Sequence, residues 1–114
     1  MDINGLWTAQ FAALSEGVGV MTIQDGNLSG GDSGYYYYGS YQQDGNRVTG
    51  KIRVVHYAGA LSSAFGPLRE LEVSFVGLAD DDLIMAQGRA LGRGVPPVPL
   101  AISLRRVARP GDFK

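Results

Sequence analysis

The chain has 114 residues, of which 45% are hydrophobic and 18% are charged. This composition is typical of a globular domain and excludes a disordered tail. Ten basic and eleven acidic residues give a net charge of −1. That balance argues against direct nucleic-acid binding, because polyanion binders carry a basic surplus. The chain has no cysteine, which excludes disulfide frameworks, thiolate zinc sites and cysteine nucleophiles.

The N-terminal sequence Met1-Asp2-Ile3-Asn4 lacks the basic start and the apolar segment of a secretory signal peptide. No apolar run approaches the length that spans a bilayer. We therefore expect a cytoplasmic protein with no membrane span.

The first half of the chain contains four segments in which apolar and polar residues alternate with the two-residue period of a strand. We expect strands at 5–14, 18–24, 27–31 and 35–42, with breaks between them that contain glycine. The pair Asp25-Gly26 predicts a two-residue hairpin turn, whose central residues need positive φ. The residues expected to face inward in the first three strands include Trp7, Ala9, Phe11, Val18, Val20 and Gly30.

The second half contains four more segments with the same period, expected at 47–56, around 70–75, at 83–89 and at 98–105. A longer connection at 57–67 follows the first of them, with room for a single helical turn at 58–65. The residues expected to face inward include Val48, Gly50, Ile52, Val54, Leu71, Val73, Phe75, Leu100, Ile102 and Leu104.

These segments predict an all-β fold, because no window shows a helical period over ten or more residues. Short connections favour antiparallel neighbours. Eight half-buried strands can hide their edges in a closed barrel or in a two-layer sandwich. The sequential order and the similar strand lengths favour an eight-stranded antiparallel up-and-down barrel. We expect one domain at 1–108 and a C-terminal tail at 109–114.

Catalytic and metal sites have weak support. The stretch Gly31-Asp32-Ser33-Gly34 matches part of a serine-protease nucleophile motif. The only histidine, His56, follows that serine, whereas the base precedes it in that fold. His56 alone cannot form a multi-histidine metal site. Glu70 and Glu72 share the solvent face of a strand, and the aspartates at 80–82 lack the spacing of a calcium loop. We predict no enzyme activity, no metal site and no cofactor.

The four consecutive tyrosines Tyr35–Tyr38 lie on an expected strand, so two face inward and two outward. Outward tyrosines are enriched at protein interfaces, whereas inward ones fill the core or offer hydroxyls to a ligand. Stacking on single-stranded nucleic acid is a third alternative, which the near-neutral charge disfavours. We assign Tyr37 to the interior and Tyr36 and Tyr38 to an interface, and the opposite assignment stays open.

The interior of such a barrel is the candidate ligand site. A barrel of eight strands is just wide enough to be filled by side chains or to hold one small molecule, and the sequence leaves both alternatives open. The residues predicted to line a ligand cavity are Trp7, Phe11, Val20, Tyr37, Ile52, Val54, Phe75 and Ile102.

The start of the first strand, Gly5-Leu6-Trp7, resembles the Gly-x-Trp signature of lipocalins and related calycin barrels. In those folds the tryptophan packs at the closed end against an arginine near the last strand. The resemblance therefore implies a cation–π contact between Trp7 and Arg106, with Arg105 as the alternative.

Most of the chain is similar to the GrlR-like family of negative regulators of type III secretion genes. The similarity rests on the Gly-Leu-Trp-Thr start, on Asp25-Gly26-Asn27 and on the stretch Gly30–Tyr41, in which Gly-Gly-Asp precedes the tyrosines. It implies a lipocalin-like barrel, a homodimer, an apolar cavity for a lipid-like molecule, and regulation by binding a transcriptional activator. Enterobacterial members carry an acidic run after the fourth strand, where this chain has 42–46 with one carboxylate, Asp44. Asp44 therefore joins Tyr36 and Tyr38 as a predicted interface residue.

Two functions are consistent with these patterns. The first is a regulator that acts by protein–protein binding, with a lipid-like ligand as a further element. The alternative is a carrier or sensor of a small hydrophobic molecule without a transcriptional partner.

Overall fold

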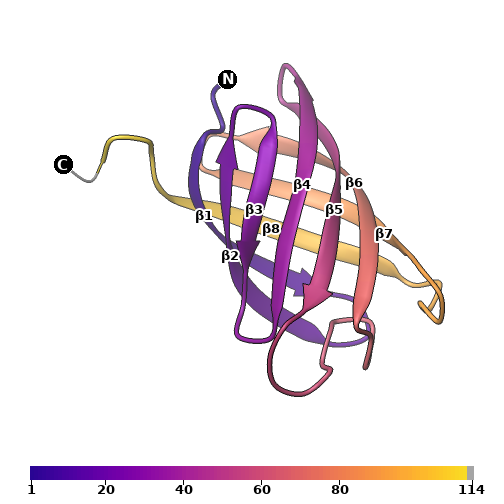
Figure 1. Cartoon of the computed structure of the whole chain (residues 1–114). Helices are drawn as coiled ribbons and strands as arrows, with labels where there is room; N and C mark the ends of the chain where they lie inside the picture. The colour runs from indigo at the N-terminus through magenta and orange to yellow at the C-terminus, as the bar shows by residue number, and fades with distance from the viewer. Residues whose placement is uncertain (113–114) are drawn as a thin grey trace.

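The computed structural model describes residues 1–112 and contains eight β-strands and no helix within them (Figure 1). The strands are β1 (Gly5–Ala12), β2 (Glu16–Gln24), β3 (Asn27–Gly31), β4 (Tyr35–Asp44), β5 (Arg47–His56), β6 (Glu70–Asp80), β7 (Leu83–Leu91) and β8 (Pro99–Ala108).

The eight strands form one closed barrel in which each strand pairs with its neighbours in the chain. All pairs are antiparallel, and β1 pairs with both β2 and β8, which closes the sheet. A register shift at Leu6 and Trp7 interrupts the seam between β1 and β8. The predicted all-β, eight-stranded antiparallel up-and-down barrel is confirmed.

The two ends of the barrel differ in their connections (Figure 1). At the end that carries the N-terminus, which we call the closed end, three hairpins turn through two residues each: Asp25-Gly26, Gly45-Asn46 and Asp81-Asp82. Asp25 and Gly26 both have positive φ, at 48° and 91°, as the hairpin prediction requires. The other end, which we call the loop end, carries the longer connections, including the segment 57–69 between β5 and β6.

The segment 57–69 contains no helical turn, which corrects the expectation at 58–65. It folds across the loop end instead, and Phe65 is buried to 4% exposure. The amides of Leu14 and Ser15 both donate to the carbonyl of Ala64, which ties this segment to the connection between β1 and β2. The segment has only a weak helical preference. Burial of the Phe65 side chain outweighs that preference, because the backbone must bend toward the barrel axis to place this side chain inside.

The inward face of β2 differs from the prediction. Val18 and Val20 point outward, and Val20 is 48% exposed. The register explains this difference, because β2 faces the inward residues of β1 with Gly17 opposite Phe11, Gly19 opposite Ala9 and Met21 opposite Trp7. The inward face of β2 at the loop end therefore consists of glycines. The inward residues predicted for β5, β6 and β8 are confirmed as buried or half-buried.

The structure predicts that alanine lowers stability at one of the two inward glycines of β2 and has little effect at the other. A Cβ at Gly19 would lie 2.8 Å from the Tyr37 hydroxyl and 3.0 Å from the carbonyl oxygen of Gly31, whereas a Cβ at Gly17 would meet nothing within 4 Å. We expect Gly19→Ala to lower the free energy of unfolding by about 1–3 kcal/mol, since overpacking displaces Tyr37. Gly17→Ala should change it by about 0.5 kcal/mol or less. Urea denaturation of both variants measures the difference, and equal stabilities would contradict the assigned β2 register.

Candidate functional site

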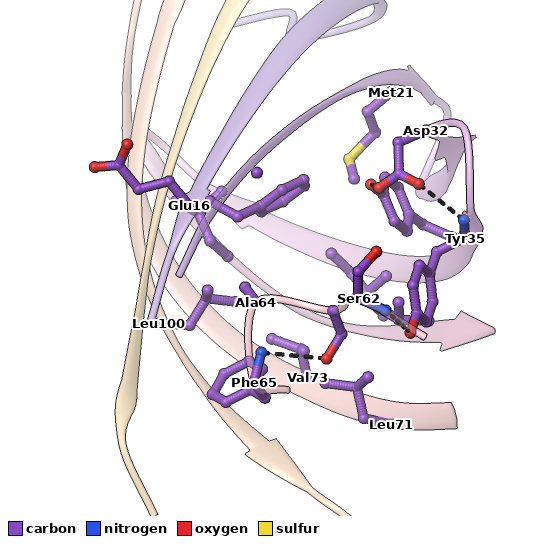
Figure 2. A pocket seen from close by; sticks show the side chains of 17 residues that line it. Glu16, Met21, Asp32, Tyr35, Ser62, Ala64, Phe65, Leu71, Val73 and Leu100 are labelled. Atoms are coloured by element: carbon purple, nitrogen blue, oxygen red, sulfur yellow. Dashed lines mark hydrogen bonds between the residues drawn. The ribbon is translucent and has the colours of Figure 1, made fainter. Parts of the chain in front are cut away.

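An apolar chamber lies inside the barrel at the loop end, with a volume of about 80 Å³ (Figure 2). Strands from all round the barrel and the segment 57–69 contribute to its wall. The lining residues are Phe11, Glu16, Gly17, Met21, Asp32, Tyr35, Tyr37, Ile52, Val54, Ser62, Ser63, Ala64, Phe65, Leu71, Val73, Leu100 and Ile102.

The chamber exists because small residues face large ones across it. Gly17 and Gly19 leave space on β2, and Tyr37 from β4 fills part of that space. The ring of Tyr37 meets the ring of Phe11 edge to face, with centroids 5.5 Å apart. Phe65 closes the chamber from the loop side (Figure 2).

One carboxylate organises the polar edge of the chamber. Oδ1 of Asp32 accepts hydrogen bonds from the backbone amides of Gly34 and Tyr35, at 2.8 Å each. Oδ2 of Asp32 accepts a short hydrogen bond from the Tyr37 hydroxyl. Burial, together with this hydrogen bond to Asp32, raises the pKa of Tyr37 far above its ordinary value of 10.0. Tyr37 therefore remains a neutral donor, and Oδ2 of Asp32, which accepts one hydrogen bond, can accept another.

The hydroxyl of Tyr35 fastens the segment 57–69 to the barrel. It donates to the carbonyl of Leu68 at 2.5 Å and accepts from the amide of Ser62 at 3.1 Å (Figure 2). Within the same segment, the amide of Phe65 donates to the hydroxyl of Ser63 at 3.2 Å. The wall of the chamber at this point is therefore a loop held mainly by a few hydrogen bonds and by the buried Phe65.

Five of the eight predicted cavity residues line the chamber: Phe11, Tyr37, Ile52, Val54 and Ile102. Phe75 lies deeper in the barrel, where it borders a second void of about 20 Å³. Trp7 is fully buried at the closed end and borders neither space. Val20 lies on the outer surface, so its assignment to the cavity is wrong.

Sequence reasoning missed two residues that define the chamber, Phe65 and Asp32. Phe65 is an aromatic residue in a connection otherwise rich in small and polar residues, and that contrast was the available signal. Asp32 precedes Gly34 and Tyr35, and an aspartate at the start of a turn commonly accepts hydrogen bonds from the backbone amides that follow it. Its bond to Tyr37 depends on tertiary contact and gives no sequence signal.

At the closed end, the Arg106 guanidinium lies over the Trp7 ring, 5.0 Å from its centroid, as predicted. The register places these two residues opposite each other on β1 and β8. Arg106 also donates to the carbonyls of Asp2, Asn4 and Asp81 and to the carboxylate of Asp82. The indole of Trp7 donates to the carbonyl of Ile3 at 3.0 Å. These bonds fix the N-terminal segment across the closed end.

Arg109, expected in a loose tail, forms ion pairs with Asp81 and Asp82. Its backbone amide donates to the Asp112 carboxylate at 2.8 Å. The remainder of the expected tail, 113–114, lies outside the described residues.

The outward tyrosines form an aromatic ladder, by which we mean Tyr36, Tyr38 and Tyr57. Tyr36 and Tyr38 stack with centroids 6.1 Å apart, and Tyr57 lies 6.2 Å from Tyr36. All three are exposed. Asp44 is exposed on the same face of β4, at the closed end. Asp44 lies eight positions beyond Tyr36, which is roughly 26 Å along the strand, so the predicted interface residues do not form one cluster.

The residues considered for catalysis lie on different parts of the barrel, and each has a structural contact or position. Nε2 of His56 lies 2.8 Å from the carbonyl oxygen of Gly59, and Ser33 lies in the turn between β3 and β4. Glu70 forms an ion pair with Arg53 on the outer surface. Asp81 and Asp82 form the turn between β6 and β7. Among residues 1–112, no three His, Asp or Glu side chains gather in an arrangement that could hold a metal ion.

Comparison with known proteins assigns no relative to the chain: no protein-family model matches the sequence, and no curated protein sequence matches it significantly. In the part of the chain that the structure describes, no helix is long and apolar enough to cross a membrane.

The contact at the closed end predicts a large stability cost when Arg106 is replaced. Arg106→Met keeps the apolar stem but leaves three carbonyls and the Asp82 carboxylate without this donor. We expect the free energy of unfolding to fall by roughly 2–4 kcal/mol. Arg105→Met, on the exposed face of the same strand, should change it by about 0.5 kcal/mol or less. Thermal and urea denaturation compare the two, and equal effects would contradict the structural role of Arg106.

The Asp32–Tyr37 bond predicts a pH dependence above neutrality. The pKa of Tyr37 is raised in the folded state, so its contribution to stability is fully present below pH 10 and is lost as the pH rises above that value. We expect wild-type protein to lose up to about 1.4 kcal/mol per pH unit from this group. Tyr37→Phe should be less stable near neutral pH, with a gap to wild type that narrows above pH 10. Urea denaturation between pH 8 and pH 11 measures the gap, and a constant gap would refute the assignment.

Proposed function

We propose that this protein is a small cytoplasmic regulator that acts by protein–protein binding, similar in kind to the negative regulators of type III secretion. The aromatic ladder, formed by Tyr36 and Tyr38 of β4 with Tyr57 beside them, carries the proposal. Tyr36 and Tyr38 are 43% and 49% exposed and stack against each other, so the apolar surface is already ordered before a partner binds. Tyrosine side chains of this kind contribute strongly to interfaces, because they bury a large area at a low entropic cost.

The ladder is the surface we propose for a homodimer. It lies on a regular part of the barrel, where Tyr36 pairs with Val55 and Tyr38 pairs with Arg53 across β4 and β5. Arg53 with its partner Glu70 gives the ladder a charged border. An aromatic centre with a polar rim is the usual composition of a specific protein interface.

The hairpin between β4 and β5 is the surface we propose for a transcriptional activator, but its chemistry differs from an acidic grip. Asp44 is its one carboxylate, and Gln43 donates to the carbonyls of Met1 and Gly45. This hairpin therefore offers a partner one carboxylate in place of several. Its Gln43 side chain is already bound to the backbone of Met1. The activator partnership rests on the sequence resemblance more than on this hairpin.

The alternative function is that of a carrier or sensor of a small hydrophobic molecule without a transcriptional partner. The chamber favours it, because apolar pockets with a few polar groups at one edge are typical ligand sites. Its volume of about 80 Å³ is roughly half that of an engineered apolar cavity of about 150 Å³ that binds benzene. A larger ligand therefore requires Phe65 to move.

Replacement of the ladder tests the proposed regulator. We expect the double variant Tyr36→Ser with Tyr38→Ser to weaken self-association at least about tenfold, because interface tyrosines typically contribute more than 1 kcal/mol each. Sedimentation equilibrium measures this effect. Leu78→Ser with Met85→Ser is the control, since these side chains are also exposed but lie on β6 and β7.

A variant of the β4–β5 hairpin tests partner binding. Tagged wild-type protein should retain a transcription regulator from host cells, and the purified regulator should then bind wild type but not Asp44→Lys, in which the one carboxylate of the hairpin is replaced. A monomeric wild type together with no recovered regulator would refute the proposal. Loss of binding in the control alone would move the interface to β6 and β7.

A further inference from the structure

A further hollow, distinct from the void beside Phe75, lies outside the chamber at the loop end, and we call it the vestibule. Its volume is about 240 Å³, and it is lined by Gly17, Val18, Asp32, Ser33, Gly34, Tyr35, Ala58, Gly59, Ala60 and Ser62. The chamber and the vestibule share Gly17, Asp32, Tyr35 and Ser62. The apolar chamber and the more polar vestibule are therefore adjacent, and these shared residues form the wall between them.

The gap between the two spaces arises from unequal strand lengths. β3 ends at Gly31, which pairs with Val20, so the first part of β2 has no partner on that side. The turn at Asp32–Gly34 and the segment 57–69 border this gap in place of a strand. Gly17 at the gap has open space beside its Cα. This part of the barrel wall is therefore thin and is formed by loops.

The charges around the two spaces have one sign. Among residues 1–112, Asp32 is the one charged side chain that lines the vestibule, and the chamber adds only Glu16. The Glu16 carboxylate points away from the chamber (Figure 2), whereas Asp32 borders both spaces. No lysine, arginine or histidine of this described part lines either space.

Asp32 is also fixed in place. Its three hydrogen bonds, from Gly34, Tyr35 and Tyr37, hold the carboxylate at the shared wall. An anionic group in the vestibule would face this carboxylate without any compensating cation. A hydroxyl, amide or ammonium group would instead find acceptors, including Asp32 and the Ser33 and Ser62 hydroxyls.

We infer that the chamber and the vestibule together bind an amphiphile whose apolar tail enters the chamber and whose head group, uncharged or cationic, stays in the vestibule. The same arrangement selects against long-chain carboxylates. This inference rests on the proposed ligand binding and adds to it the chemical class of the ligand.

The tail enters by displacing Phe65. At about 80 Å³ the chamber is too small for a long alkyl chain, and Met21, Ile52 and Ile102 border both the chamber and the deeper void. Outward movement of Phe65 would vacate the space next to Leu71 and Val73. The hydrogen bonds of Tyr35 to Ser62 and Leu68 are the contacts that this movement breaks.

Three probes with one tail and different head groups test the inference: decan-1-ol, decyltrimethylammonium and decanoate, each below its aggregation concentration. Isothermal titration calorimetry with the wild-type protein measures the three affinities. We expect decan-1-ol and decyltrimethylammonium to bind at least about tenfold more tightly than decanoate, because of like-charge repulsion by Asp32.

Two variants locate the source of the selectivity. Asp32→Asn keeps an acceptor for the two backbone amides and removes the charge, so the discrimination against decanoate should shrink to about twofold or less. Asp80→Asn is the matched control, because this exposed carboxylate at the closed end borders neither space, and it should leave the discrimination unchanged. The wild-type comparison stands by itself if Asp32→Asn fails to fold.

The outcomes separate this inference from the function it rests on. Binding of decanoate as tight as that of the other probes overturns the head-group inference and leaves ligand binding intact. Loss of discrimination in Asp80→Asn instead of Asp32→Asn overturns the role of Asp32. If no probe binds, either to the wild type or to a Phe65→Ala variant with an opened chamber, then ligand binding itself is refuted.

Discussion

Closure of the sheet between β1 and β8 is the constraint on which the rest of the structure depends. Once eight strands surround one axis, the interior has a fixed width, and the volume of the inward side chains decides where space remains. Trp7 and Ile23 fill the closed end, whereas Gly17 and Gly19 leave the loop end open. The chamber is therefore a consequence of the residue sizes along β2 in a barrel that cannot contract around them.

The two ends are closed by different kinds of contact. At the closed end, two-residue hairpins and the buried Arg106 hold the N-terminal segment with several hydrogen bonds beneath a cation–π contact. At the loop end, the segment 57–69 is fastened by the Tyr35 hydroxyl, the Ala64 carbonyl and the burial of Phe65. Breaking the first set would leave buried polar groups without partners, which is costly. The second set includes the apolar burial of Phe65, so opening the loop end would expose that side chain to water.

Much of the barrel was predictable, because alternation, short turns and the Gly-Leu-Trp start all indicate the same fold. The inward faces of β5, β6 and β8 followed directly from large apolar residues in alternate positions. The error on β2 has a physical origin. Val18 and Val20 are the apolar residues of an alternating stretch, yet the register with β1 turns the glycines inward. Alternation alone gives two faces, and a one-residue choice exchanges them.

The candidate site was less predictable than the fold, because its defining contacts join residues far apart in sequence. Phe65 reaches the chamber through a long connection with no periodic pattern, and Asp32 meets Tyr37 only after β3 and β4 have paired. The same contacts give the site its polarity. A barrel with glycines at one end would otherwise hold an apolar space with no chemical preference. In the amphiphile site that we propose, the single fixed carboxylate beside that space is the group that would distinguish the head of the ligand from its tail, and it lies where the strand pairing ends.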